Sequence, residues 1–83
     1  MAWDEDLDTT GMKCPLPVLK ARKRLNGMRP GAVLRLKTTD PMAAIDVPHF
    51  CTEAGHELIS REVVADGHVW LLRRTAVAAA END

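Results

Sequence analysis

The spacing of apolar residues changes several times along this chain between the period of a helix and the period of a strand. From Pro15 to the Pro30-Gly31 pair, apolar residues recur every three or four positions, which predicts an amphipathic helix. This stripe consists of Val18, Ala21, Leu25 and Met28. Residues 32–38 alternate instead, which predicts a half-buried strand. A chain with these periods has to fold as layers of short helices and strands.

A second helical stripe follows Asp40-Pro41, which we interpret as an N-cap and a proline at the first helical position. The stripe consists of Ala43, Val47, Phe50, Cys51 and Ala54, and it ends at Gly55. Pro48 lies inside this segment and predicts a kink, or a division into two short helices. Residues 58–65 and 68–73, joined by Asp66-Gly67, have the pattern of a β-hairpin.

With a short strand at residues 6–9, the predicted element order is β-α-β-α-β-β. Two helices against four strands bury their apolar faces most simply when both helices lie on one face of the sheet. We therefore expect an α/β (α+β) fold, a two-layer sandwich with a mixed four-stranded sheet. At 83 residues the chain can enclose one core, and we expect a single domain at 6–74 with loose termini at 1–5 and 75–83.

The formal net charge of −1 conceals an uneven distribution of charge. Residues 13–37, here called the basic block, carry eight basic and no acidic residues, whereas residues 38–66 carry six acidic residues against Arg61 alone. The neutral total argues against a general polyanion binder, but the basic block would attract an anionic or acidic partner. The block also fits the solvated face of a helix.

The chain has no apolar run near the ~20 residues that span a bilayer, and its acidic start does not resemble a signal peptide. Its two cysteines, Cys14 and Cys51, are too few to cross-link a small secreted domain. We therefore expect a cytoplasmic protein with free thiols and no membrane contact, and we expect it to be a monomer.

Residues 11–17, with the sequence GMKCPLP, have the clearest chemistry in the chain. Cys14 would lie at the N-terminus of the first helix, where the helix dipole stabilises a thiolate. Pro15 and Pro17 suit the first helical turn and fix its backbone. Lys13 and the basic helix would lower the pKa of Cys14 further. This setting favours a reactive cysteine over the alternative, a small buried side chain.

Cys51 lies on the second helical stripe beside Phe50, which favours a buried structural thiol over a redox partner of Cys14. Cys51, His49 and His56 supply at most three ligands, and their spacing matches no standard zinc pattern. The chain also has no glycine-rich phosphate loop. We therefore expect neither a metal nor a cofactor.

A wider set of residues matches a known family. It consists of Leu7-Asp8, Gly11, Cys14-Pro15-x-Pro17, Arg22-Lys23, Pro30-Gly31, Asp40-Pro41-x-Ala43, Asp46-Val47-Pro48-x-Phe50-Cys51 and Gly55-His56-x-Leu58. With this pattern, which covers residues 6–74, the chain resembles the TusA/SirA family of sulfur-carrier proteins. The resemblance implies the same β-α-β-α-β-β sandwich. It also implies a cysteine that accepts sulfane sulfur as a persulfide and passes it on.

The resemblance places the persulfide on Cys14, framed by Pro15 and Pro17. It implies donor and acceptor proteins such as cysteine desulfurases, rhodanese-like proteins and DsrE-like proteins. One branch of the family supplies the sulfur of 2-thiouridine in tRNA, so tRNA would be only an indirect partner. Leu16 stands where that branch has a glutamate, which leaves tRNA thiolation, sulfur oxidation and other sulfur trafficking open.

Six residues near Cys14 are candidates for docking these proteins, and Arg22 and Asp40 among them match positions that the family presents near its cysteine. The six are Lys13, Leu16, Lys20, Arg22, Lys23 and Asp40. Two other functions remain open. One is an RNA-binding or regulatory module that uses the basic block, because the fold also resembles the C-terminal domain of a translation initiation factor. The other is a dithiol switch, which needs the α-carbons of Cys14 and Cys51 within roughly 7 Å.

Overall fold

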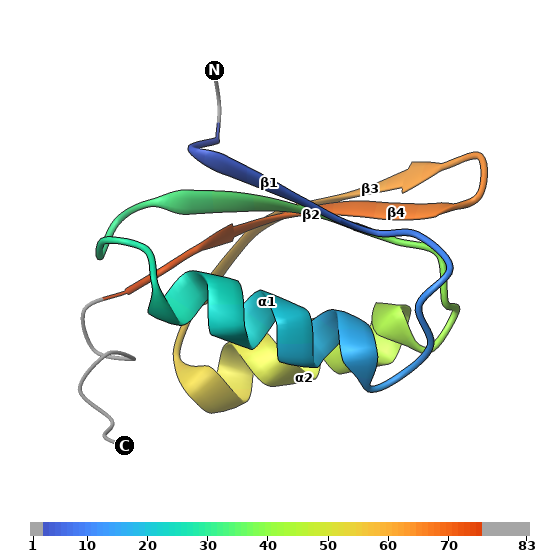
Figure 1. The fold of residues 1–83 in the computed structure, drawn as a ribbon, viewed down its shortest axis with the longest axis horizontal. Helices are drawn as coiled ribbons and strands as arrows, with labels where there is room; N and C mark the ends of the chain where they lie inside the picture. Colours follow the sequence, from blue (N-terminus) through green and yellow to red (C-terminus); the bar gives the residue numbers. More distant parts are fainter. Residues whose placement is uncertain (1–2, 76–83) are drawn as a thin grey trace.

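Two helices lie side by side on one face of a four-stranded sheet in the computed structural model, which describes residues 3–75 (Figure 1). The elements in chain order are β1 (Glu5–Thr9), α1 (Leu16–Asn26), β2 (Val33–Thr38), α2 (Ala43–Ala54), β3 (Glu57–Val64) and β4 (Gly67–Arg73). This order and the two-layer arrangement confirm the predicted fold class.

The sheet has the strand order β1-β2-β4-β3 and mixed strand directions. β1 pairs parallel to β2, with α1 as the crossover between them, and the other two pairings are antiparallel. Because β1 and β2 are parallel, the loops that follow these two strands start at the same end of the sheet. Those two loops lead into α1 and α2, so the beginnings of both helices meet at one end of the molecule (Figure 1).

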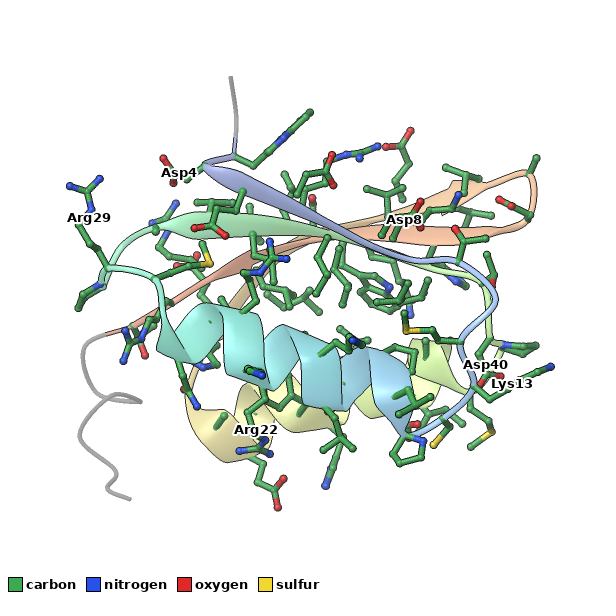
Figure 2. The ribbon with its side chains drawn as sticks, in the orientation of Figure 1. Asp4, Asp8, Lys13, Arg22, Arg29 and Asp40 are labelled. Carbon is green, nitrogen blue, oxygen red and sulfur yellow. The ribbon has the colours of Figure 1, made fainter. Side chains whose placement is uncertain are left out.

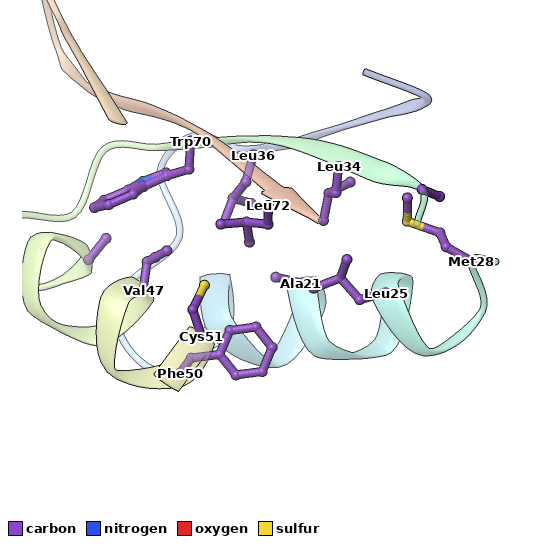
Figure 3. Close-up of a cluster of buried hydrophobic side chains, with 12 residues drawn as sticks. Ala21, Leu25, Met28, Leu34, Leu36, Val47, Phe50, Cys51, Trp70 and Leu72 are labelled. Atoms are coloured by element: carbon purple, nitrogen blue, oxygen red, sulfur yellow. The ribbon is translucent and has the colours of Figure 1, made fainter. Parts of the chain in front are cut away.

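The core lies between the sheet and the two helices (Figure 3). Its fully buried sheet residues are Leu34, Leu36, Trp70 and Leu72, and its buried helical residues include Ala21, Leu25, Val47, Phe50 and Cys51. The indole N–H of Trp70 donates a hydrogen bond of 3.0 Å to the Thr38 hydroxyl, so the one polar group of this large side chain is satisfied inside the core.

The face of the sheet opposite the helices carries ion pairs. Arg35 and Asp6 lie directly opposite each other on β2 and β1, with nitrogen and oxygen 3.1 Å apart. The Lys37 ammonium lies 3.3 Å from the Asp66 carboxylate in the β3–β4 turn. This face of the sheet is therefore exposed to solvent.

The first helix is shorter than predicted, because it ends at Asn26 and not at Pro30-Gly31. Gly27 closes its last turn, and the guanidinium of Arg74, next to the end of β4, donates to the carbonyl oxygens of Asn26 and Met28. Met28 is buried in the core all the same, although it lies beyond the helix. The helix thus ends at Asn26, before its apolar period ends, and a long-range contact satisfies carbonyl groups at that end.

The second helix also departs from the prediction at its start and in its middle. The helix begins at Ala43 with Met42 as its N-cap residue, so Asp40 and Pro41 are not the N-cap and the first helical residue. They form a turn before the helix, in which the Asp40 carboxylate accepts hydrogen bonds from the N–H groups of Cys14 and Met42. The helix is continuous through Pro48, so the predicted division into two helices is wrong. Val47 and Phe50, on either side of the proline, are both buried and hold the two turns against the same core.

Residues 3–5, predicted to be part of a loose terminus, are attached to the sheet. Glu5 opens β1, and Asp4 exchanges two hydrogen bonds of 2.8 Å with the backbone of Val33. The Thr75 hydroxyl donates to the carbonyl oxygen of Gly55 at 2.7 Å. The rest of the predicted loose C-terminus, residues 76–83, lies outside the described residues. Between residues 3 and 75, no helix is long and apolar enough to cross a membrane.

Candidate functional site

Cys14 is exposed in the loop between β1 and α1, at the end of the molecule where both helices begin. Its backbone N–H donates a hydrogen bond of 2.6 Å to Asp40 in the loop between β2 and α2. The other carboxylate oxygen of Asp40 accepts from the backbone N–H of Met42 at 3.2 Å. Figure 2 shows Asp40 and Lys13 together at this end. One carboxylate thus joins the two loops and holds the backbone of Cys14.

The start of α1 follows directly from its prolines. Pro15 is the N-cap residue and Pro17 lies within the first turn, where the N–H groups they lack would have no helical acceptor. The backbone N–H of Leu16 donates to the Lys13 carbonyl at 2.8 Å. Pro17 thus lies in the first turn as predicted, whereas Pro15 lies one position before the helix, at the N-cap.

Two carboxylates next to Cys14 reverse the predicted direction of its pKa. A side-chain hydrogen bond with Asp46 on α2, partial desolvation and the negative charges of Asp46 and Asp40 all raise the pKa of Cys14. The expectation of a lowered pKa was wrong, because it counted only neighbours in sequence. Hydrogen bonds from the backbone N–H groups of Cys14 and Met42 lower the pKa of Asp40, and the positive charge of Lys13 lowers it further.

Exposed apolar side chains surround the beginnings of both helices, and we call this set the apolar rim. It consists of Leu16, Leu19, Met42 and Ile45. Ile45 is 65% exposed although it is a large aliphatic residue inside a helix. The sequence pattern pointed only to Leu16. Leu19 and Ile45 could have been found, since Leu19 is out of phase with the stripe of α1 and Ile45 lies opposite the stripe of α2. Nothing in the local pattern marks Met42 as exposed.

Two grooves flank α1. The larger, the β1–α1 groove, has a volume of about 570 Å³ and is lined by Glu5, Leu7, Leu16, Leu19, Lys20, Lys23, Arg24 and Gly27. The smaller, the α1–α2 groove, has a volume of about 170 Å³ and is lined by Cys14, Pro15, Val18, Asp46, His49, Phe50 and Glu53. The candidate docking residues Leu16, Lys20 and Lys23 thus share one groove, and Cys14 opens into the other.

Arg22 lies apart from the other candidate docking residues. Its guanidinium lies over the ring of Phe50, 5.0 Å from the ring centre, and Figure 2 shows it well away from Lys13 and Asp40. Of the six candidates, Lys13 and Asp40 adjoin Cys14, three line the β1–α1 groove, and Arg22 reaches the surface of α2.

The basic block does not form one surface. Three of its eight residues are in ion pairs, namely Arg24 with Glu5, Arg35 with Asp6 and Lys37 with Asp66. Arg35 and Lys37 also lie on the outer face of the sheet, away from α1. This division gives no support to an RNA-binding module that uses the whole block.

Cys51 is buried in the core between α2 and the sheet, which confirms the prediction of a buried structural thiol (Figure 3). Burial raises its pKa to about 11. It lines neither groove beside α1, so the dithiol switch with Cys14 has no support in the structure. Over residues 3–75, no group of three His, Cys, Asp or Glu side chains is arranged to hold a metal ion.

This architecture and its motif match known proteins. A family model described as sulfurtransferase TusA matches residues 5–74. The chain belongs to the TusA family. That membership confirms the family resemblance that the sequence motifs indicated.

Members of the TusA family with curated names are similar over most of their length. The sulfur carrier protein TusA of Pseudomonas paraeruginosa is 36% identical over 73 residues, which cover 88% of this chain and 92% of that protein. The sulfur carrier protein TusA of Pseudomonas entomophila is 37% identical over 73 residues, covering 88% of this chain and 91% of that protein. The same fold occurs in the crystal structure of a SirA-like protein from Desulfitobacterium hafniense. It has a TM-score of 0.70 and 18% identity, and the match covers 84% of this chain and 95% of that one.

Proposed function

We propose that this protein is a sulfur carrier that accepts sulfane sulfur on Cys14 as a persulfide and passes it to an acceptor protein. The observation that carries the proposal is the accessibility of Cys14 at the tip of α1, in a chain whose other cysteine is buried. Membership of the TusA family, and relatives named sulfur carrier proteins, support it.

The chemistry needs only one exposed sulfur. The Cys14 thiolate attacks the outer sulfur of a donor's persulfide, a new S–S bond forms, and the donor's own S–S bond breaks to release the donor thiolate. An acceptor thiolate then attacks the outer sulfur on Cys14, and Cys14 leaves as the thiolate. Each step breaks one S–S bond and forms one, so no external oxidant or reductant is required.

Docking would use the apolar rim and the basic side of the β1–α1 groove. Lys20 and Lys23 would attract an acidic partner surface, while Leu16 and Leu19 offer exposed apolar area next to the cysteine. Such a surface suits brief docking with successive proteins. Cysteine desulfurases, rhodanese-like proteins and DsrE-like proteins are the candidate partners, and a reducing cytoplasm, which keeps thiols free, is the compartment we propose.

Mass spectrometry of the loaded protein tests this function. After incubation with a cysteine desulfurase and cysteine, or with a rhodanese and thiosulfate, the Cys14 peptide should gain the mass of one sulfur atom. Cys51→Ser should still gain it and Cys14→Ser should not. Sulfur found on Cys51 alone, or retained after Cys14→Ser, would overturn the assignment.

A further inference from the structure

A carboxylate from α2 faces the sulfur of Cys14. Asp46 lies in the first turn of α2, and it lines both the α1–α2 groove and a small cleft beneath Cys14. The side chains of Cys14 and Asp46 therefore lie side by side in this cleft, with a carboxylate next to the thiol. The contact joins the loop before α1 to α2, so the packing of α1 against α2 determines it.

The other charged groups around Cys14 are arranged differently. Both carboxylate oxygens of Asp40 accept backbone N–H groups, from Cys14 and from Met42, and Lys13 lies close enough to lower the pKa of Asp40. On α2, His49 and Glu53 line the same groove as Asp46. Both oxygens of Asp40 are therefore occupied by backbone groups, while Asp46 lies beside the thiol in both the cleft and the groove.

We propose that Asp46 is a positioning residue for sulfur transfer, whose carboxylate lies beside the unloaded Cys14 in the cleft between the two helix starts and keeps it as the thiol until a partner protein docks. The proposal rests on the sulfur-carrier function of Cys14. The direction of the effect agrees with it, because the hydrogen bond and charge of Asp46 raise the pKa of Cys14.

This arrangement would protect the empty carrier. Alkylating agents and oxidants react with the thiolate, so a cysteine held as the thiol at neutral pH reacts slowly with small molecules that meet it by chance. The exposed sulfur of Cys14, at the mouth of the α1–α2 groove, stays accessible to a docked protein. Asp46 would thus restrict reactivity without restricting access.

The pH dependence of Cys14 alkylation by iodoacetamide tests the proposal in the full-length protein. Asp46→Asn keeps the shape of the side chain and removes its charge, so the midpoint of the rate profile should move to lower pH and the rate at pH 7 should rise several-fold. Glu53→Gln is the matched control, because it makes the same change on the same helix and groove. It should leave the profile unchanged. An unchanged midpoint in Asp46→Asn, or an equal shift in Glu53→Gln, overturns the proposal.

A second measurement needs no variant at Asp46. The ultraviolet absorbance of the thiolate, taken as the difference between the protein and Cys14→Ser, gives the titration of Cys14 in the folded chain and in urea. The midpoint should be higher in the folded chain, and a folded midpoint equal to or below the unfolded one overturns the proposal. Neither measurement uses a sulfur donor, so either can fail while persulfide loading of Cys14 succeeds, and the reverse.

Discussion

The backbone N–H of Cys14 and the carboxylate of Asp40 form a hydrogen bond of 2.6 Å between loops 26 residues apart in sequence. The bond fixes the backbone of Cys14 while its thiol stays exposed. It also connects the start of α1 to the turn before α2, because the second oxygen of Asp40 accepts from Met42. The position of Cys14 therefore depends on the packing of both halves of the domain.

The contribution of Asp40 to stability should depend on pH. Its folded pKa is lowered, first by the hydrogen bond from Cys14 and then by that from Met42. A carboxylate with a lowered folded pKa stabilises the fold above its ordinary pKa, and this stabilisation is lost as pH falls through the folded value. Asp40→Ala should therefore lower the Tm at neutral pH, and the difference from wild type should shrink in acid. Glu62→Ala, which removes an exposed carboxylate on β3, is the control and should show no comparable trend.

Two lysines of the β1–α1 groove should affect docking without affecting the fold. Lys20→Ala combined with Lys23→Ala should raise the KM for the donor protein that loads Cys14, and this effect should weaken as salt rises. The matched control is Arg35→Ala combined with Lys37→Ala, which removes two bases of the same block from the opposite face of the sheet. Equal effects of the two double variants would show that only net charge matters and would contradict a docking role for the groove.

The hydrogen bond between Trp70 and Thr38 should be worth measuring by a double-mutant cycle. Thr38→Val removes the acceptor and leaves the buried indole N–H of Trp70 unpartnered, which should cost about 1–3 kcal/mol in the free energy of unfolding. In a Trp70→Phe background the N–H is absent, so the same substitution should cost much less. Urea denaturation gives all four free energies, and equal costs in both backgrounds would rule out the hydrogen bond as the cause.

Gly67, at the start of β4, should not tolerate a side chain. A Cβ atom there would lie 1.9 Å from the carbonyl oxygen of Thr38 and 2.8 Å from the α-carbon of Thr39, and backbone atoms cannot move aside as a flexible side chain can. Gly67→Ala should therefore lower the free energy of unfolding by about 2 kcal/mol or more. Gly27→Ala is the control, because its Cβ would meet only the Arg24 carbonyl at an ordinary 3.6 Å. A Gly67→Ala protein as stable as Gly27→Ala would contradict the close approach.

Local sequence signals were sufficient for the element order and for the position of Cys14 at the start of a helix. The stripe of Val18, Ala21 and Leu25 predicted α1, and the alternation at 32–38 predicted β2, because hydrophobic period reflects which side of an element is buried. Pro15 and Pro17 marked the start of α1 directly after Cys14, since proline suits a helix's first turn wherever that helix lies.

Helix ends and the charge around the site depended on residues far away in sequence. Arg74 bonds carbonyl groups at the end of α1, while the burial of Val47 and Phe50 keeps α2 continuous through Pro48. Asp46 lies within the family motif, but its sequence position did not show that it shares a cleft with Cys14.

The sequence by itself determined the secondary-structure order, the single core and a cysteine at the tip of a helix. Those properties follow from hydrophobic period and from the backbone limits of proline, both of which act over a few neighbouring residues. The tertiary structure decided that Asp40 and Asp46 flank Cys14, that its pKa rises, and that the basic block divides between two faces. Electrostatic interactions depend on distance in space and not on separation in sequence. The direction of the pKa shift of Cys14 therefore depends on the parallel pairing of β1 and β2, which brings the beginnings of both helices together.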